Sequence, residues 1–311
     1  MKFLLPIHAI TSTPLLAALI ALLVGALSGA NAGPFLPGEI LVNQINGNSV
    51  QRYSASGTLL QTFTGPNTFW EGAALTPGGN LVTSFDSSGD GINIFDPNGT
   101  LITSFALTSG RGISDVSVFP IGTIAVSDSN NNGVQFRSQT GTLLNTVFVG
   151  STLGSTVGSD GILYAASRSG GALYRISTGA VSLGTISLSF LPGDLVMNPV
   201  DGTLWVSGKN DLLVHHIQTD GTVIGSFATG LSGTFLGIGL APDGGSLYVT
   251  ATTSAEVKHF DLSGNLLDSF PLTSPNTVGY ITVVPNPTPE PGSAMLLLSS
   301  LAFVAFHRRR G

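Results

Sequence analysis

The sequence predicts an all-β, six-bladed β-propeller with four strands per blade, because one strand-rich unit repeats six times. Each unit has a glycine in a tight turn, and successive turn glycines are 42, 42, 38, 42 and 43 residues apart. They are Gly57, Gly99, Gly141, Gly179, Gly221 and Gly264. Radial repetition of four-stranded sheets is a propeller. A solenoid of stacked repeats is the alternative, but it needs polar caps at its ends, and the sequence shows none.

The strands of each unit can be placed from turn chemistry and composition. Asn98-Gly99 and Asp220-Gly221 supply the positive φ that hairpin turns need, so a strand lies on either side of them. Before each hairpin come a second strand and an apolar first strand that often ends in proline, as in Val116 to Pro120. Charged residues are only 9% of the chain, which suits short strands and tight turns better than helices.

The phase of the repeat predicts how the ring closes. The repeats begin with the second strand of a unit, near Glu39, and end with a first strand, Gly279 to Val284. We therefore expect the last strand to complete blade one beside the strand from Ile40 to Asn43. This arrangement hides two sheet edges that would otherwise invite aggregation.

The N-terminal residues 1–32 are predicted to be a secretory signal peptide. Lys2 gives a positive start, residues 15–27 are almost wholly apolar, and Ala30-Asn31-Ala32 is a small-residue cleavage site. An uncleaved anchor is the alternative, and the cleavage site argues against it. The sequence thus divides into this signal, a propeller at 33–285 and a tail at 286–311.

The tail has three parts, namely Pro289-Glu290-Pro291, an apolar run from Gly292 to Phe306, and Arg308-Arg309-Arg310. An apolar run of about 15 residues is short for a helix that must span a bilayer, which takes roughly 20. It therefore suits a temporary anchor. The three arginines should stay on the cytoplasmic side and leave the body outside the inner membrane.

This tail resembles the PEP-CTERM sorting signal of Gram-negative bacteria. The resemblance implies export through the Sec translocon, processing by an exosortase-type enzyme, and delivery to the cell envelope or extracellular matrix. A GPI-type signal lacks a basic end, and the Leu-Pro-x-Thr-Gly motif of a Gram-positive wall signal is absent from the sequence. We expect the C-terminal helix to meet the membrane only until the tail is removed.

The charge of the exported body excludes some partners. Seven of the 11 basic residues and nearly all 17 acidic residues lie between the signals, so the body carries a net charge of about −10. This argues against nucleic acid and anionic lipid as partners. The chain has no cysteine, which excludes disulfides, thiol nucleophiles and cysteine-bound metals.

The blades resemble NHL-type repeats and, more loosely, SMP-30/gluconolactonase and YncE-like propellers. The nearest local match is the stretch from Val126 through Asp128 to Phe136, and the resemblance covers residues 38–285. Propellers of this kind host lactonases, binding modules and interaction platforms, so the fold does not give the function.

Three carboxylates are candidates for a divalent metal site, with Ca²⁺ as the first choice. Glu71, Asp115 and Asp194 fall near the start of predicted inner strands, which face the central channel. Hard cations prefer oxygen ligands. SMP-30-like lactonases hold a central metal with such side chains, and Glu71-Gly72 is similar to that family's early Glu-Gly pair. The family's asparagine ligand and catalytic aspartate are not identifiable in this sequence.

Other polar motifs favour structural roles. Asp128-x-Asn130-x-Asn132 matches half of a calcium loop, but Gln139 stands where its glutamate should fall, so a turn explains it equally well. Asp86 and Asp90 form a similar partial match. His216 and His259 occupy a repeat position held elsewhere by Arg52, Ile94, Phe136 and Tyr174, and a position shared with Ile and Phe indicates packing.

Phe69 and Trp70 precede an inner strand and could form an exposed stacking platform for a glycan, although packing is the alternative. Trp205 alternates within a strand and is predicted to lie in the core. No nucleophile elbow, P-loop or zinc-protease helix is present in the sequence. We therefore expect a non-enzymatic propeller that binds glycan or protein, with exopolysaccharide or envelope proteins as partners. The alternative is a metal-dependent hydrolase of the SMP-30 type.

Overall fold

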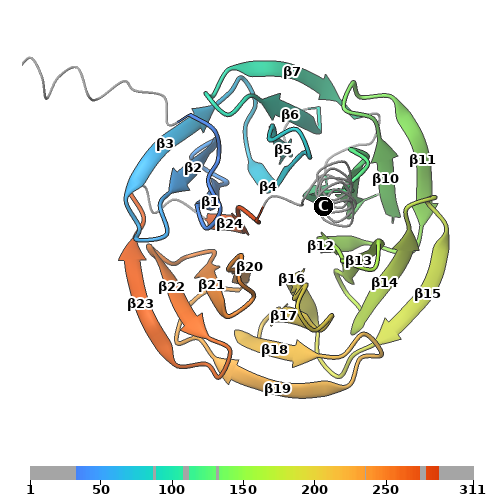
Figure 1. The fold of residues 1–311 in the computed structure, drawn as a ribbon. Helices are drawn as coiled ribbons and strands as arrows, with labels where there is room; N and C mark the ends of the chain where they lie inside the picture. The colour runs from blue at the N-terminus through green and yellow to red at the C-terminus, as the bar shows by residue number, and fades with distance from the viewer. Residues whose placement is uncertain are drawn as a thin grey trace, which may run out of the picture.

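A computed structural model describes residues 33–86, 89–107, 112–130, 133–234, 236–273 and 278–286. Six four-stranded sheets stand as blades around one axis, and neighbouring strands within each sheet are antiparallel (Figure 1). The predicted fold is therefore confirmed.

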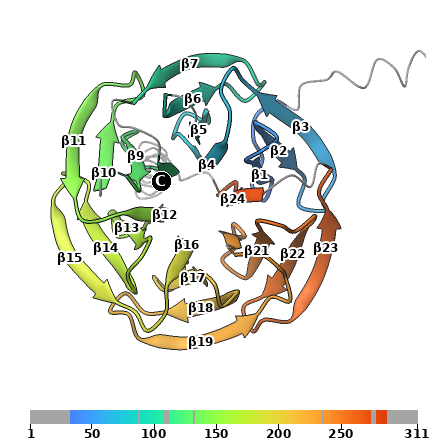
Figure 2. The ribbon, with the colours of Figure 1, turned by 180° about the vertical axis from the view of Figure 1, so that it is seen from behind.

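Six inner strands surround the axis (Figure 2). They are β4 (Trp70–Leu75), β8 (Ile113–Val118), β12 (Thr152–Val157), β16 (Pro192–Met197), β20 (Leu236–Leu240) and β24 (Val278–Val283). The second strands are β1 (Ile40–Gln44), β5 (Leu81–Phe85), β9 (Ile124–Asp128), β13 (Ile162–Ser167), β17 (Leu204–Gly208) and β21 (Ser246–Ala251).

The third strands are β2 (Ser49–Tyr53), β6 (Gly91–Phe95), β10 (Gly133–Arg137), β14 (Ala172–Ser177), β18 (Leu213–Ile217) and β22 (Glu256–Asp261). The outer strands are β3 (Leu59–Thr64), β7 (Leu101–Ala106), β11 (Leu143–Phe148), β15 (Ser182–Ser187), β19 (Val223–Ala228) and β23 (Leu266–Pro271). Because the strands alternate in direction, one face of the disc holds the loops that lead into inner strands and those between second and third strands. We call it the loop face, and the opposite face, with the remaining hairpin turns, the turn face.

The last strand closes the ring as predicted. β24 pairs with β1 in blade one, with Ile40 opposite Val283 and Leu41 opposite Thr282. The backbone of Val284 adds two hydrogen bonds beyond the strand, to Gly38 at 2.9 Å and to Glu39 at 2.8 Å. Both ends of the propeller therefore leave from the turn face.

The hydrophobic core lies between adjacent blades. One cluster, for example, joins Leu41 and Phe63 of blade one to Trp70 and Phe95 of blade two. The rings of Phe63 and Phe95 meet edge to face, with centroids 5.9 Å apart. Each blade buries apolar side chains against the next, at about 1.5–3 kcal/mol for each large side chain, so closing the ring adds the contacts between the last blade and the first.

The repeat predicted the turns with one error. Gly57, Gly99, Gly141, Gly221 and Gly264 all have positive φ, as hairpin turns require. In blade four, however, Ala180 takes that position with a φ of 56°, and Gly179 does not. The alignment was therefore one residue out of register in this blade.

The inner strands begin about three residues earlier than their apolar runs indicate. In blade two, Trp70 pairs with Phe85 and Ala73 pairs with Thr83, so Glu71 and Gly72 form a bulge. The hydroxyl of Ser84 accepts the N–H of Gly72 at 2.9 Å and satisfies the backbone there. A bulge interrupts the alternation that sequence patterns detect.

The predicted signal peptide at 1–32 and the sorting residues Pro289, Glu290, Pro291, Arg308, Arg309 and Arg310 lie outside the described residues. In the part of the chain that the structure describes, no helix has the length and apolarity that a membrane span requires.

Candidate functional site

A ring of alternating small and large residues surrounds the propeller axis. At equivalent inner-strand positions the blades carry Gly72, Asp115, Gly154, Asp194, Gly237 and Tyr280. Each aspartate of the ring packs against the glycine of the preceding blade. A Cβ atom on Gly72 would lie 2.2 Å from Asp115 Oδ1, and one on Gly154 would lie 2.6 Å from the Cα atom of Asp194. The glycines are thus required for the acidic side chains to fit.

Both aspartates of this ring bind backbone amides of the following blade. Asp115 Oδ2 accepts the N–H of Ser155 at 2.7 Å and its hydroxyl at 3.1 Å. Asp194 Oδ2 accepts the N–H of Ile238 at 2.9 Å, and its Oδ1 accepts the N–H of Leu195 at 2.8 Å. The two side chains therefore tie neighbouring blades together at the axis.

Tyr280 completes the ring and is 5% exposed. Its hydroxyl shares a hydrogen bond with Ser114 of blade three, although Tyr280 itself belongs to blade one. The Ser114 hydroxyl also donates to the carbonyl of Thr152 at 2.9 Å. The tyrosine side chain therefore reaches past blade two to blade three and is buried near the axis. Tyr280 is not among the residues predicted for the site, although alignment on the strand-ending prolines puts it at the position of Asp115.

Burial makes these acids hard to ionise. Desolvation raises the pKa of Asp115 to about 7. Desolvation, followed by repulsion from Asp115, raises the pKa of Asp194 well above its usual value. Desolvation, then repulsion from Asp86 and Asp115, raises the pKa of Glu71 to about 8, and Arg168 acts in the opposite direction.

The predicted metal ligands do not form a chelating cluster. Among the described residues, no group of three or more histidine, aspartate or glutamate side chains is arranged to hold a metal ion. The carboxylate oxygens of Asp115 and Asp194 instead accept hydrogen bonds from backbone amides. Glu71, Asp115 and Asp194 share one electrostatic environment, but the arrangement does not fit a metal ion.

The partial calcium loop in blade three is a hydrogen-bonded turn. Asp128 Oδ1 accepts the N–H of Asn130 at 3.0 Å, and Oδ2 accepts the side-chain amide of Gln135 at 3.0 Å. Asn132 lies outside the described residues. In blade two, desolvation and the neighbouring Asp86 and Asp128 raise the pKa of Asp90 to about 7.

Of the two aromatic residues predicted to form an exposed platform, one is buried and one is exposed. Trp70 is fully buried, packs on Phe95 with ring centroids 5.5 Å apart, and donates its indole N–H to the carbonyl of Asn67 at 2.8 Å. The prediction that Trp70 forms a ligand surface is therefore wrong, because β4 extends back to Trp70 and its ring packs in the core. Phe69 is 46% exposed and has a φ of 56°, which is rare for an aromatic residue. Only Phe69 can serve as a platform.

The histidines pack, as predicted. His216 stacks on Trp205 with ring centroids 4.0 Å apart, and His259 stacks on Tyr248 at 4.2 Å. Both pairs join the second and third strands at equivalent registers. Trp205 itself is 2% exposed, which confirms its place in the core.

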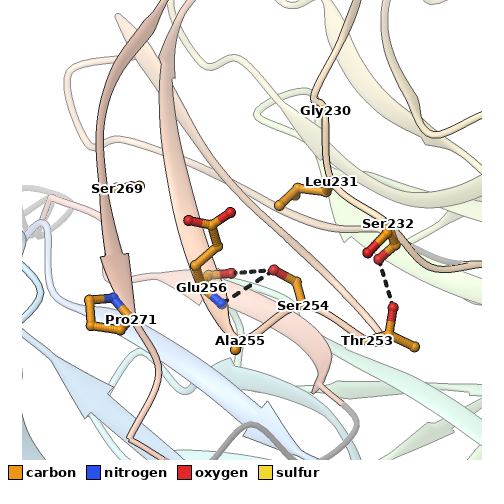
Figure 3. A pocket seen from close by; sticks show the side chains of 9 residues that line it. All are labelled: Gly230, Leu231, Ser232, Thr253, Ser254, Ala255, Glu256, Ser269 and Pro271. Carbon is orange, nitrogen blue, oxygen red and sulfur yellow. Dashed lines mark hydrogen bonds between the residues drawn. The ribbon is translucent and has the colours of Figure 1, made fainter.

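A shallow pocket of about 430 Å³ opens on the loop face of blade six (Figure 3). Thr253 donates its hydroxyl to the carbonyl of Ser232 at 2.8 Å, and Ser254 bonds both backbone groups of Glu256. Ser269 lies on its outer side. The remaining lining residues are Gly230, Leu231, Ala255 and Pro271. The lining combines hydroxyl groups, a carboxylate and two apolar surfaces, a mixture that suits a small hydroxylated ligand.

Comparison with known proteins gives the fold. No family model and no curated protein matches the chain. A protein of unknown function from Bacteroides caccae is 12% identical, with a TM-score of 0.66 over 80% of this chain and 99% of that chain. A chain of a nidogen/laminin complex is 16% identical, with a TM-score of 0.65 over 79% and 97% of the two chains. Virginiamycin B lyase from Staphylococcus aureus is 13% identical, with a TM-score of 0.60 over 83% and 97%.

What these proteins share with the chain is the propeller. At such low identity the likeness extends to the fold alone, and the named proteins range from a lyase to a component of a protein complex. The resemblance to NHL and SMP-30 repeats finds no match among family models.

Proposed function

We propose that this protein is an exported, non-enzymatic propeller that is sorted by its C-terminal tail and binds carbohydrate outside the cell. The observation that supports the non-enzymatic part is the burial and hydrogen bonding of the large side chains near the axis. Tyr280 occupies the place where propellers often hold ligands, and Asp115 and Asp194 are committed to backbone amides. A carboxylate that already accepts such hydrogen bonds is poorly placed to act on a substrate.

The histidines support the same conclusion. In this chain His215 and His216 lie on β18 and His259 lies on β22, both third strands, with their rings packed against aromatic neighbours. None of the three is on an inner strand.

The proposed sorting agrees with the position of the chain ends. β24 ends at Val283, and Asn286 still bonds the carbonyl of Pro242 at 2.9 Å on the turn face. Pro289 follows three residues after Asn286. A tail held in a membrane would therefore place the turn face toward that membrane and leave the loop face, with its pocket, free for ligands.

The pocket supports a neutral, hydroxylated ligand. Its polar groups are mainly Ser and Thr hydroxyls, and Leu231 and Pro271 offer apolar surface to the CH groups of a sugar ring. The acidic body disfavours polyanions. An exopolysaccharide without dense negative charge meets both conditions.

One observation favours an enzyme as the second candidate. A half-buried carboxyl with a raised pKa, such as Glu71 at about 8, can act as a general acid near neutral pH. Hydrolysis of aldonolactones by the purified protein, lost in the Glu71→Gln variant, would support this candidate. Calorimetry with Ca²⁺ tests the metal separately, and we expect no binding at millimolar ion.

Blocking the pocket tests carbohydrate binding. Ser269→Phe should abolish retention of the full-length protein on exopolysaccharide from its native host, because the new ring would fill the pocket. Ser226→Phe is the matched control, since Ser226 occupies the same place in β19 and does not line this pocket. Equal retention of both variants and of the unchanged protein would overturn the assignment of the pocket.

Intact-mass measurement tests sorting. Protein isolated from the surface of its native host should lack the tail that follows Pro289, and deletion of the exosortase-type gene should restore the tail. An unprocessed C-terminus in the wild-type host would show that the tail is a permanent anchor.

A further inference from the structure

The outer strands carry an apolar belt that the core does not use. Eleven of the 16 exposed large hydrophobic side chains lie at the starts of these strands, near the turn face. We call them, with the half-buried Leu60, the apolar rim. Its members are Leu59, Leu60, Leu101, Ile102, Leu143, Leu144, Val181, Leu183, Val223, Ile224, Leu266 and Leu267.

A β-bulge recurs at the same place in all six blades. In blade two, Phe95 pairs with Leu101 and Ile94 pairs with Thr103, so Ile102 is the extra residue. The extra residues of the other blades are Leu60, Leu144, Leu183, Ile224 and Leu267. Every bulge thus presents one apolar side chain of the rim.

The bulges decide what kind of contact the rim can make. An exposed strand edge can normally pair with a strand of another molecule, and a bulge interrupts that pairing. The rim therefore does not favour extension of the sheets from one molecule to the next. Its exposed Leu and Ile side chains can still be buried by packing against another apolar surface.

Charge limits which partner can approach the rim. The six outer strands hold a single charged residue, Asp268, whose carboxylate lies 3.3 Å from Nδ1 of His259 in its own blade. The turn face carries acidic side chains, including the half-buried Asp96 and the exposed Asp220, each of which accepts backbone N–H groups of its own turn. Two copies that meet face to face would bring such groups together, whereas two copies that meet at their rims would not.

We propose that the apolar rim is a lateral contact surface for further copies of this chain. A second copy supplies the uncharged apolar partner that the rim requires, because it carries the same rim. Each disc has six small patches, so one copy can contact several neighbouring copies. An assembly of many copies can therefore be stable although each contact is weak. This inference does not depend on the pocket or on carbohydrate binding.

Sedimentation of the full-length protein tests the proposal. We expect association that grows with protein concentration and strengthens with added sodium sulfate, which favours apolar burial. In the variant Ile102→Thr/Leu144→Thr/Ile224→Thr/Leu267→Thr, the dissociation constant for self-association should rise at least tenfold. Threonine suits exposed strands, so the fold should survive, and a thermal melt checks this.

The control removes as many exposed apolar side chains outside the rim. Leu36→Thr/Ile121→Thr/Phe148→Thr/Val200→Thr should associate like the unchanged protein. Three results would each overturn the proposal. The unchanged protein could stay monomeric at all concentrations, the rim variant could associate as strongly as the unchanged protein, or the control variant could lose association as much as the rim variant.

Discussion

The carboxylate of Asp115 accepts the backbone N–H of Ser155 across the boundary between blades three and four, at 2.7 Å. Both residues are buried. A propeller has no chain connection between neighbouring inner strands at this level, so this hydrogen bond acts as a clasp between blades. Asp194 makes the same contact with Ile238, two blades further on.

Asp115→Ala should lower the free energy of unfolding by about 1–3 kcal/mol, because the N–H of Ser155 would lose its acceptor while remaining buried. Urea denaturation measures the change. Asp243→Ala, at an exposed turn where the carboxylate accepts the N–H of Gly245 at 2.9 Å, is the control and should change stability by about 0.5 kcal/mol or less. Equal stability of the Asp115 variant and the wild type would show that water replaces the carboxylate.

Stability should fall as the pH rises from 7 to 8.5. The pKa of Asp115 in the folded protein is about 7 and that of Glu71 is about 8, both above their ordinary values of 3.8 and 4.5. The folded state therefore binds more protons than the unfolded state in this range, and unfolding becomes easier as the pH passes the folded pKa values. Each such proton adds a slope of up to about 1.4 kcal/mol per pH unit.

Asp115→Asn tests the origin of this slope. The amide cannot ionise, so the variant should lose less stability than the wild type between pH 7 and 8.5. His216 does not interfere there, because desolvation lowers its pKa and its protonation costs stability only at lower pH. A stability that rises over this interval would contradict the raised pKa values.

The sequence predicted the fold because turn chemistry and apolar runs repeat with it, and these depend on local structure. It also showed that Asp115, Asp194 and Gly72 share one repeat position. It could not show what the carboxylates bind, since their partners are backbone amides of another blade, which leave no side-chain signature. The role of Tyr280 could not be predicted for a related reason, because its partner Ser114 belongs to another blade and is far away in sequence.

Trp70 shows the second limit. Its neighbours suggested a loop, but the bulge at Glu71 and Gly72 extends β4 back to Trp70 and turns its ring inward. A bulge adds a residue to one strand and reverses the inward and outward assignment beyond it. Because the sequence placed Trp70 in a loop before the strand, its ring was predicted to be exposed.

Gly154→Ala should destabilise the protein by about 1–3 kcal/mol through overpacking. The new Cβ atom would lie 2.6 Å from the Cα atom of Asp194 and 2.7 Å from its Oδ1 atom, so an inner strand would have to move. Gly225→Ala is the matched control, since no atom lies within 4 Å of its Cβ position. Thermal melts compare the two, and an equal loss in both would point to backbone effects of alanine.

Deletion of residues 279–284 should prevent folding. It removes most of β24, so β1 would lose its inner partner and blade one would lose the apolar side chains that pack against blade six. Circular dichroism and protease resistance measure the result. A chain that ends at Asn286 is the control and should fold, because it keeps all four strands of blade one.

A stable, soluble protein lacking 279–284 would contradict this closure. That outcome would mean that three strands suffice for blade one, and that the contacts between blades hold the ring without a complete sheet.

Phe69 is the remaining candidate for carbohydrate stacking. Its ring is 46% exposed, and its N–H donates to Asn48 Oδ1 at 2.9 Å, which holds the residue at a φ of 56°. A bulky residue in this region stores backbone strain, of order 1–3 kcal/mol, that the surrounding structure must offset.

Phe69→Ala should weaken exopolysaccharide binding severalfold if the ring contacts a sugar, and it should leave the melting temperature nearly unchanged. Phe148→Ala removes an exposed ring from blade three and is the control. Loss of binding in both variants would indicate a general effect of apolar surface, and loss in neither would confine binding to the pocket of blade six.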